Sequence, residues 1–422
     1  MKRLMFLVCG LALIAATGFS APDSAQTSSF RAGVASATVN PPEGVFLGGN
    51  EYNRKSTTVH DNLYAKAIVW DDGKTPLALV VVDALSLQYE PTVKAIRAAA
   101  SEKTKALHIP PERIIVQATH THCAPDTIGI YGPDATTCGR NEAYMKQLID
   151  TASDQVAKAA TNLQPATLSY AETECVGWAV NDSEPKILDN SVTILICKNA
   201  QGQPVATLTN FACHPTVLDE NTQQISADWA GAFYKKMGET LPAEHLFLQG
   251  GVGGWIQPET PERTFALAEK YGNDLAAKVL AAIPNAKPVE GTDIRFAHKV
   301  FQMPCPSPMF KQMSELNLVA RNMAGGAVET EVAWFALGNA QFATHPGETA
   351  PEYTKETKAL MKTGPCFILG LAIDHLGYII PPRFFDNTKD IKFAEYLTSM
   401  SPGREAGASM MAALKEIIPA AK

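Results

Sequence analysis

Apolar runs that suit buried β-strands alternate along this chain with stretches of helical spacing. Residues 77–85 form a continuous apolar run, which is typical of a strand covered on both faces. Helical spacing follows over 91–106, and a second buried strand is predicted over 113–118. No internal repeat or low-complexity linker interrupts this alternation. The pattern therefore predicts the α/β class: a single large domain with a mixed β-sheet flanked by helices.

The same alternation continues to the C-terminal end, so we do not divide the chain and expect residues 30–420 to form one domain. The remaining predicted elements are a helix over 141–160, paired strands over 192–197 and 204–211 with a turn at 199–202, a helix over 230–239, a strand over 245–248, a helix over 264–282, a hairpin over 330–342 turning at Gly338-Asn339, a helix over 352–362, a strand over 366–373 and a helix over 403–417.

Composition excludes several classes of protein but names no function. The 422 residues include 36 Lys and Arg against 43 Asp and Glu, for a formal net charge of −7. This mildly acidic balance offers no basic face for nucleic acid, so we expect no nucleic-acid partner. Apolar residues make up 46% and charged residues 19%. Those shares exclude both a disordered chain and a membrane protein with many spans.

The first 21 residues have the pattern of a secretory signal peptide. Lys2 and Arg3 precede a short apolar run over 4–16, and small residues follow up to Ala21. The run is too short for a good transmembrane helix, although an uncleaved N-terminal anchor is the alternative. We therefore expect an exported protein, periplasmic or extracellular.

Seven cysteines remain after the signal: Cys123, Cys138, Cys175, Cys197, Cys213, Cys305 and Cys366. An odd number in an exported protein leaves at least one free thiol or an intermolecular bond. Cys197 lies in an apolar strand-like run, which predicts a buried thiol.

Four segments place a side chain that can bind a metal just after a strand-like run, where α/β sheets gather ligands. In the first, His120 and His122 are two residues apart, so they share a face of an extended chain. One can then serve as a ligand and the other as an acid, base or anion partner. In the second, His214 is followed by the stiff Pro215. Hydrogen-bonded structural histidines are the alternative for both segments.

The third and fourth segments carry Glu348 and Tyr378. Glu348 is either a ligand or an acid favoured by the first turn of a helix, and Tyr378 is either a ligand or a core residue. Asp228 stands at a predicted helix entry, where the alternative role is an N-terminal cap. Two histidines and a carboxylate form a familiar zinc site with an open position for water.

In this order, the motifs resemble the neutral/alkaline, non-lysosomal ceramidase family. The resemblance covers nearly the whole predicted mature chain, from about Ala32 to about Lys415, and Thr-His-Thr-His before a Pro is its most specific element. The motifs are Val-His-Asp-Asn-Leu-Tyr-Ala-Lys, Val-Val-Val-Asp, Thr-His-Thr-His-x-x-Pro, His-Pro-Thr with Ser-Ala-Asp-Trp-Ala-Gly behind it, Pro-Gly-Glu and Gly-Tyr-Ile.

This resemblance implies a zinc-dependent amide hydrolase that splits ceramide into sphingosine and fatty acid. It places the zinc ligands on His120, His214, Glu348 and Tyr378 and turns His122 toward the scissile carbonyl. The implied partner is a small-molecule or lipid substrate, and a lipid is compatible with peripheral contact with a membrane.

The chain departs from the family's pattern at three places. The active-site serine of its Gly-Asp-x-Ser-Pro stretch corresponds here to Gln257, and the Asp corresponds to Trp255. A substrate-contacting Arg of the family falls near residues 180–182, where no Arg is present. Full ceramidases also carry a C-terminal β-sandwich domain, for which we expect no room in this chain. Cys123, often Ser in the family, is a smaller change: a spare ligand or a packed neighbour.

Because zinc can activate a water molecule, hydrolysis does not require the missing serine. The candidate catalytic residues are therefore His122, Gln257, Tyr378 and Asp228, with His60 as a further proton carrier. Two alternatives remain: a zinc hydrolase of the same fold acting on a different amide or ester, and an inactive exported metal-binding homologue.

Overall fold

A computed structural model describes residues 30–419, and the predicted signal peptide lies outside that range. Its largest sheet has nine strands in the order β4-β3-β2-β1-β5-β7-β8-β9, with β11 paired to β5. These strands are β1 (Arg31–Thr38), β2 (Tyr64–Asp71), β3 (Leu77–Val82), β4 (Ile114–Ala118), β5 (Gln164–Glu174), β7 (Ser191–Asn199), β8 (Pro204–Phe211), β9 (Glu244–Gln249) and β11 (Lys287–Pro288). The sheet is mixed because β3 and β4, and also β8 and β9, run parallel while the other pairs run antiparallel.

A second sheet has four strands in the order β12-β13-β14-β16, and two small two-stranded sheets complete the strand pairing of the described residues. The strands of the second sheet are β12 (Ile294–Pro304), β13 (Ala327–Leu337), β14 (Ala340–Thr344) and β16 (Cys366–Leu369). The small sheets pair β6 (Ala179–Asn181) with β10 (Ile256–Pro258), and β15 (Glu348–Thr349) with β17 (Tyr378–Ile379).

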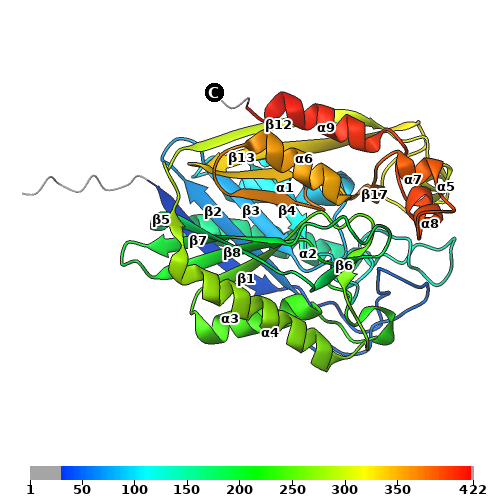
Figure 1. Ribbon diagram of the computed structural model, residues 1–422, viewed down its shortest axis with the longest axis horizontal. Coiled ribbons are helices and arrows are strands. Elements are labelled where there is room, and N and C mark those ends of the chain that lie inside the picture. The colour runs from blue at the N-terminus through cyan, green and yellow to red at the C-terminus, as the bar shows by residue number, and fades with distance from the viewer. Residues whose placement is uncertain (1–29, 420–422) are drawn as a thin grey trace, which may run out of the picture.

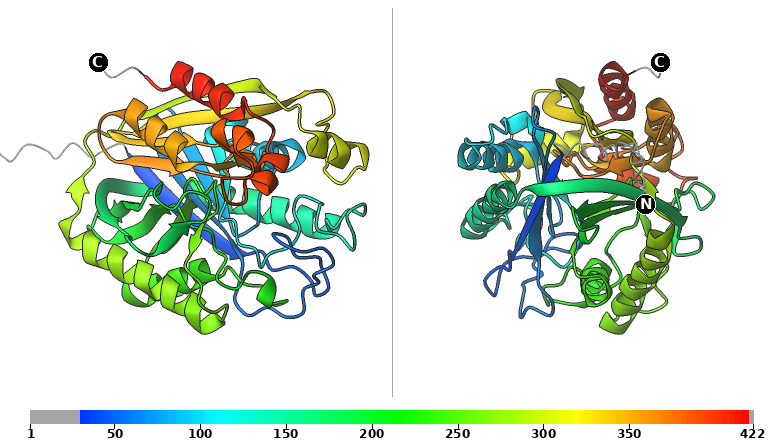
Figure 2. Two further views of the ribbon diagram at one scale, coloured as in Figure 1. Left: turned by 45° about the vertical axis from the view of Figure 1, so that its right-hand side comes forward. Right: turned by 90° about the vertical axis from the view of Figure 1, so that its left-hand side faces the viewer.

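The helices cover the outer faces of the sheets (Figures 1 and 2). α2 packs on β1 to β3, α3 and α4 pack together beside β5 and β9, and α9 packs on β12 and β13. The helices are α1 (Lys94–Lys103), α2 (Glu142–Thr161), α3 (Trp229–Thr240), α4 (Phe265–Ala282), α5 (Pro308–Glu315), α6 (Pro351–Met361), α7 (Arg383–Asp386), α8 (Ala394–Ser399) and α9 (Ala406–Ile417). Within residues 30–419, none of them has both the length and the apolar content needed to cross a membrane.

The two large sheets meet through buried aromatic rings. Trp70 on β2 lies 6.3 Å from the ring of Phe335 on β13 and 6.4 Å from that of Phe342 on β14. Phe342 also stacks on Phe367 of β16 at 4.3 Å. Burial of such large rings contributes strongly to the stability of a core, so these contacts fix the second sheet against the first.

The α/β class with mixed sheets and flanking helices is confirmed, and most predicted elements occur near their expected bounds. In the predicted hairpin, Leu337 pairs with Ala340, which leaves Gly338-Asn339 as the two-residue turn. The predicted strand over 366–373 ends earlier, at Leu369. Leu371 and Ile373 have φ of 49° and 70°, a left-handed backbone that no strand contains. The strands also divide between two large sheets, because apolar periodicity does not specify pairing partners.

Buried amides join the C-terminal ends of strands from both sheets. The Gln117 side chain on β4 donates to the carbonyl oxygens of Gln249 and Gly370, at 2.8 Å each. The Asn210 side chain on β8 donates to the carbonyls of Leu248 and Ile368, at 2.9 Å each. Buried amide groups that donate to two backbone carbonyls favour one arrangement of the backbone, so the exits of β4, β8, β9 and β16 are held together.

All seven cysteines of the described range are free thiols. Cys197 is fully buried as predicted, and burial raises the pKa of its thiol to about 12. The Cys123 thiol is also buried, which raises its pKa well above the usual value, and it contacts the carbonyl oxygen of Asp219 at 3.7 Å. A neutral thiol in this environment packs as a small apolar group.

Candidate metal centre and active site

His120 follows β4 and has a left-handed backbone, with φ of 73°. Such strain in a residue other than glycine is often retained at functional sites. The His120 Nδ1 atom donates to the carbonyl oxygen of Leu85 at 2.6 Å, so the lone pair of the neutral ring belongs to Nε2. That Nε2 atom is shielded from solvent and has no hydrogen-bond partner among the described residues.

His214 follows β8 and is oriented in the same way. Its Nδ1 atom donates to the carbonyl oxygen of Ile256 at 2.7 Å, while its Nε2 atom lies 3.0 Å from Oε2 of Glu348. In the neutral tautomer set by Ile256, a nitrogen lone pair would face a carboxylate oxygen. Two such acceptors attract each other only if a proton or a metal cation lies between them.

Glu348 lies on β15 beside Tyr378 of β17, its partner in the parallel ladder. Its Oε1 atom is 3.5 Å from Nε2 of His120 and 3.5 Å from Nε2 of His375. Burial by itself would raise the pKa of Glu348, but the charge of His120 and the close approach of the His120, His214 and His375 rings hold that pKa well below its usual value. The carboxylate is therefore negative at neutral pH.

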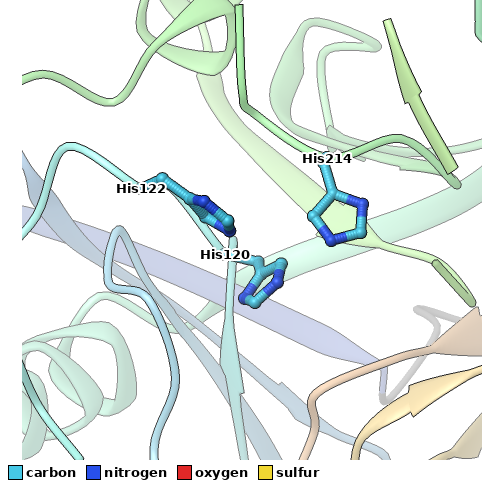
Figure 3. A group of neighbouring side chains, drawn as sticks. All are labelled: His120, His122 and His214. Atoms are coloured by element: carbon cyan, nitrogen blue, oxygen red, sulfur yellow. The ribbon is translucent and has the colours of Figure 1, made fainter. Parts of the chain in front are cut away.

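His122 shares the site with His120 and His214, and the three rings turn toward one another from two separate chain segments (Figure 3). Its ring centroid is 5.0 Å from that of His120 and 5.8 Å from that of His214. Burial lowers the pKa of His122 to about 4, although Asp219 counteracts this effect. Gly49 lies so close that a Cβ atom there would be 2.5 Å from the His122 ring, so the loop requires glycine.

Asp219, which the sequence patterns did not single out, orients His122. Its Oδ1 atom lies 3.1 Å from Nδ1 of His122 and also accepts from the side chain of Asn50. Arg263 lies 3.3 Å from the other carboxylate oxygen, and Arg54 donates to the Asp219 carbonyl at 2.6 Å. In the sequence, Asp219 could be recognised only as an acidic residue five positions after His214. His122 is thus held with its Nε2 atom free.

The donor atoms fit a metal ion. The ligand atoms of His120, His122 and His214 lie within 4.8 Å of one another, and Glu348 adds a buried negative oxygen. Unpartnered buried nitrogen atoms are unfavourable unless something binds them. Neutral imidazoles and a carboxylate also match the donor preferences of zinc and of related transition metals.

Tyr378 is buried close to Glu348 along the ladder, and its hydroxyl accepts a 2.8 Å hydrogen bond from the Trp255 indole. Burial and the negative charge of Glu348 raise the pKa of Tyr378 well above its usual value. The ring also faces Tyr396 of α8 at 6.0 Å. The predicted role of Tyr378 as a ligand stays a prediction.

Gln257 and Trp255 are the residues that the resemblance aligns with the family's Ser and Asp. Gln257 lies on β10, pairs with Val180 on β6, and donates its amide to the carboxylate of Asp182. The serine position and the segment expected to carry the family's Arg are therefore neighbours in space. The assignment of Gln257 as a catalytic residue remains a prediction.

Asp228 caps α3 and also holds the loop that follows His214. Its carboxylate accepts from the backbone N–H groups of Trp229 at 2.6 Å, Leu218 at 2.8 Å and Val217 at 3.2 Å. Burial raises its pKa to about 7. These contacts are those of a helix cap. Proton transfer by Asp228 stays a prediction.

His60 is half-exposed, pairs with Asp61 at 3.0 Å and stacks on Phe265 at 3.7 Å. Together with Asp228 it borders a cavity of about 1040 Å³, whose lining includes none of the three clustered histidines. A proton-carrying role for His60 at the histidine cluster is likewise still a prediction.

His375 was not among the predicted site residues, although it lies in the fourth strand-exit segment, three positions before Tyr378. Its ring is 6.0 Å from that of His120, and its Nε2 atom is shielded without a hydrogen-bond partner. The neighbouring Asp374 is fixed by Arg321 at 2.7 Å and by Thr330 at 2.7 Å. In the sequence, His375 could have been noticed because an Asp-His pair follows the predicted strand directly.

Comparisons with known proteins identify the family. The model for "Neutral/alkaline non-lysosomal ceramidase, N-terminal" matches residues 30–245, about half of the chain. The chain belongs to this family. The matched range includes His120, His122 and His214, whereas Glu348 and Tyr378 lie beyond it.

Individual relatives of the family are distant. Over 307 residues the chain is 22% identical to the neutral ceramidase of Mycobacterium tuberculosis. The aligned region covers 63% of this chain and 47% of the relative. The chain thus spans about half the length of that relative. The crystal structure of neutral ceramidase from Pseudomonas aeruginosa matches with a TM-score of 0.73 and 16% identity, over 92% of this chain and 74% of the other. A structure described as a ceramidase complexed with C2 gives a TM-score of 0.75 and 15% identity over the same shares. These structures support the fold.

Proposed function

We propose that this chain is a zinc-dependent amide hydrolase that cleaves the N-acyl bond of a ceramide-like lipid. The proposal rests on one observation above all: Glu348 places its two carboxylate oxygens against Nε2 of His120 and Nε2 of His214. Two imidazoles and a carboxylate that meet in this way are a common donor set for catalytic zinc. Family membership supplies the amide as the class of bond.

The metal would be held by His120, His214 and Glu348, with Tyr378 beside them as the fourth predicted ligand. When bound, zinc lowers the pKa of a water molecule toward neutrality and polarises a carbonyl group. The protein orients these donors through backbone carbonyls: Leu85 and Ile256 accept the Nδ1 protons and so direct each Nε2 lone pair inward.

His122 is the candidate for moving a proton at the site. Asp219 engages its Nδ1 atom, which leaves Nε2 free to accept a proton or to face the scissile carbonyl. Because burial lowers the pKa of His122 to about 4, the ring is neutral at neutral pH. A neutral imidazole with one free nitrogen can accept a proton or a hydrogen bond at that nitrogen.

Exposed aromatic side chains beside the site favour a substrate with an apolar chain. Phe393 is 37% and Tyr396 is 44% exposed. Their rings lie 4.2 and 5.4 Å from Trp255, whose indole donates to Tyr378. This aromatic rim, made of Trp255, Phe393 and Tyr396, supplies the apolar surface that an acyl or alkyl chain would cover.

A second candidate is a hydrolase of the same fold that acts on another amide or an ester. It is favoured by Gln257 at the serine position, where the amide is already engaged by Asp182. Gln257 offers no nucleophile, so the contacts to the substrate there differ from those that a serine would make. A metal-binding homologue without activity is the remaining alternative.

We also propose that the protein is exported, on the basis of the signal-like pattern over residues 1–21. Sequencing the N-terminus of protein recovered from the periplasm or the medium tests this: a start near residue 21 or 22 supports export, and recovery of the intact N-terminus from the cytoplasm contradicts it.

The main experiment combines metal analysis with a substrate panel. Protein purified without chelator should contain zinc and release fatty acid from labelled ceramide, and His120→Ala should lose both properties. Turnover of short N-acyl amino acids or simple esters, with none of ceramide, would replace the first candidate by the second. Zinc-free protein without hydrolytic activity would contradict both.

A further inference from the structure

We infer that His375 is a ligand of the same metal ion, in addition to the residues that the family resemblance supplies. The inference rests on the proposed metal site, because His375 is assigned to the ion through its position beside Glu348. It concerns which imidazoles of this chain bind the metal.

The Nε2 atom of His375 lies where a metal ligand would lie. Nε2 of His375 lies 3.5 Å from Oε1 of Glu348, and Nε2 of His120 lies at the same distance from the same oxygen. Donor atoms about 2.0–2.2 Å from one zinc ion, at the corners of a tetrahedron, are about 3.3–3.6 Å apart. The two distances therefore match those between ligands of a common ion, and they are too long for hydrogen bonds.

The Nε2 atom of His375 is also buried without a partner among the described residues. The side chain is 10% exposed, and among the described residues no group forms a hydrogen bond with this nitrogen. It points at a carboxylate that already faces two other imidazoles. When the neutral ring carries its proton on Nδ1, the Nε2 lone pair faces the carboxylate, and the two attract each other only if a cation lies between them.

The backbone at His375 is held in place by the neighbouring Asp374. Asp374 is buried and bound by Arg321 at 2.7 Å, by the Thr330 hydroxyl at 2.7 Å and by the Tyr89 N–H at 2.9 Å. The N–H group of His375 donates to the same carboxylate at 2.8 Å. A side chain on such a fixed segment reaches the site without a large loss of conformational freedom.

His122 is the competing third imidazole, since its ligand atom lies with those of His120 and His214. However, Asp219 engages its ring, whereas the ion pairs of Glu348 within the described residues are with His120, His214 and His375. His375 contacts the carboxylate itself. We therefore assign His375 as a ligand of the metal and His122 as a residue that faces the substrate.

The test is zinc binding by the full chain, measured by competition with a chromophoric chelator, together with X-ray absorption to count imidazole ligands. We expect His375→Ala to weaken zinc binding at least about 10-fold and to remove one imidazole from the count. His122→Ala should leave the count unchanged. His108→Asn, at an exposed position with φ of 56°, is the matched control and should bind like wild type.

A wild-type count of two imidazoles, or unchanged affinity in His375→Ala, overturns the inference while the proposed function stands. Failure of the wild-type protein to bind zinc overturns both. His375→Gln keeps the volume and polarity of the side chain, so it provides the same comparison if the alanine variant does not fold. Circular dichroism in the presence of chelator checks that each variant is folded.

Discussion

The Nε2 atom of His214 lies 3.0 Å from Oε2 of Glu348, although 134 positions separate the two residues in sequence. This contact joins the exit of β8 in the large sheet to β15, which follows β14 of the second sheet. The candidate metal centre therefore depends on how the two sheets pack, and its donor atoms are brought together only in the folded chain.

Glu348→Gln should remove the negative donor while keeping the shape of the side chain. Since even outer partners of a metal ligand typically contribute 10- to 100-fold to metal affinity or activity, we expect a loss above about 100-fold in both. Zinc content and hydrolysis should be measured together. Full activity with bound zinc in the variant would contradict the assignment of Glu348 as a ligand.

Asp219→Asn should impair His122 without removing the metal ligands. The amide cannot stabilise the Nδ1 proton of His122 as the carboxylate does, so we expect kcat to fall about 10- to 100-fold. Zinc stoichiometry should stay at the wild-type value. Loss of zinc together with activity would show that Asp219 supports the metal centre itself.

Asp83 should make the stability depend on pH. Its buried carboxylate accepts from the N–H of Tyr64 and from the hydroxyls of Thr119 and Tyr234, and burial raises its pKa to about 6, although Lys66 lowers it. The folded protein therefore retains a proton that the unfolded chain releases near pH 3.8. The free energy of unfolding should fall as pH rises from about 4 to about 6, by up to about 3 kcal/mol.

Urea unfolding at several pH values measures this effect. In Asp83→Asn the corresponding slope should disappear, because the amide does not titrate. An identical slope in the wild type and the variant would assign the pH dependence to other groups.

Arg321→Leu should destabilise the protein strongly. Arg321 and Asp374 form a 2.7 Å ion pair with side chains 2% and 0% exposed, so the variant leaves a buried carboxylate unpaired. We expect the free energy of unfolding, measured with a denaturant, to fall by about 3–5 kcal/mol. Arg404→Leu breaks the exposed pair with Asp386 and should cost less than about 1 kcal/mol. Equal losses of unfolding free energy in the two variants would contradict the prediction that the buried ion pair matters more than the exposed one.

The double variant Phe393→Ala with Tyr396→Ala should reduce hydrolysis of long-chain substrates more than that of short-chain ones. Partial burial of an aromatic ring by a ligand contributes about 1 kcal/mol, which corresponds to roughly a 5- to 10-fold loss in kcat/KM. Val300→Ala, at an exposed position on β12, serves as the control. An equal loss for both chain lengths would exclude the aromatic rim as a chain-binding surface.

Local patterns in the sequence predicted most elements and the individual site candidates. The apolar run of β3, the helical spacing of α2 and the Gly338-Asn339 turn are set by nearby residues, so they could be predicted from the sequence. His120 and Glu348 were also singled out as candidates, because each stands just after a strand, and strand ends collect functional groups.

Long-range packing decided the rest. Asp219 and His375 acquire their places only because the loop after β8 folds back on His122 and the segment after β16 turns beside Glu348. Hydrophobic periodicity tells which face of a strand is buried, but it does not specify which strands pair or where a polar side chain points at their ends. The sequence alone thus determined the elements and the family's motifs, whereas the tertiary structure decided which carboxylate faces which imidazole.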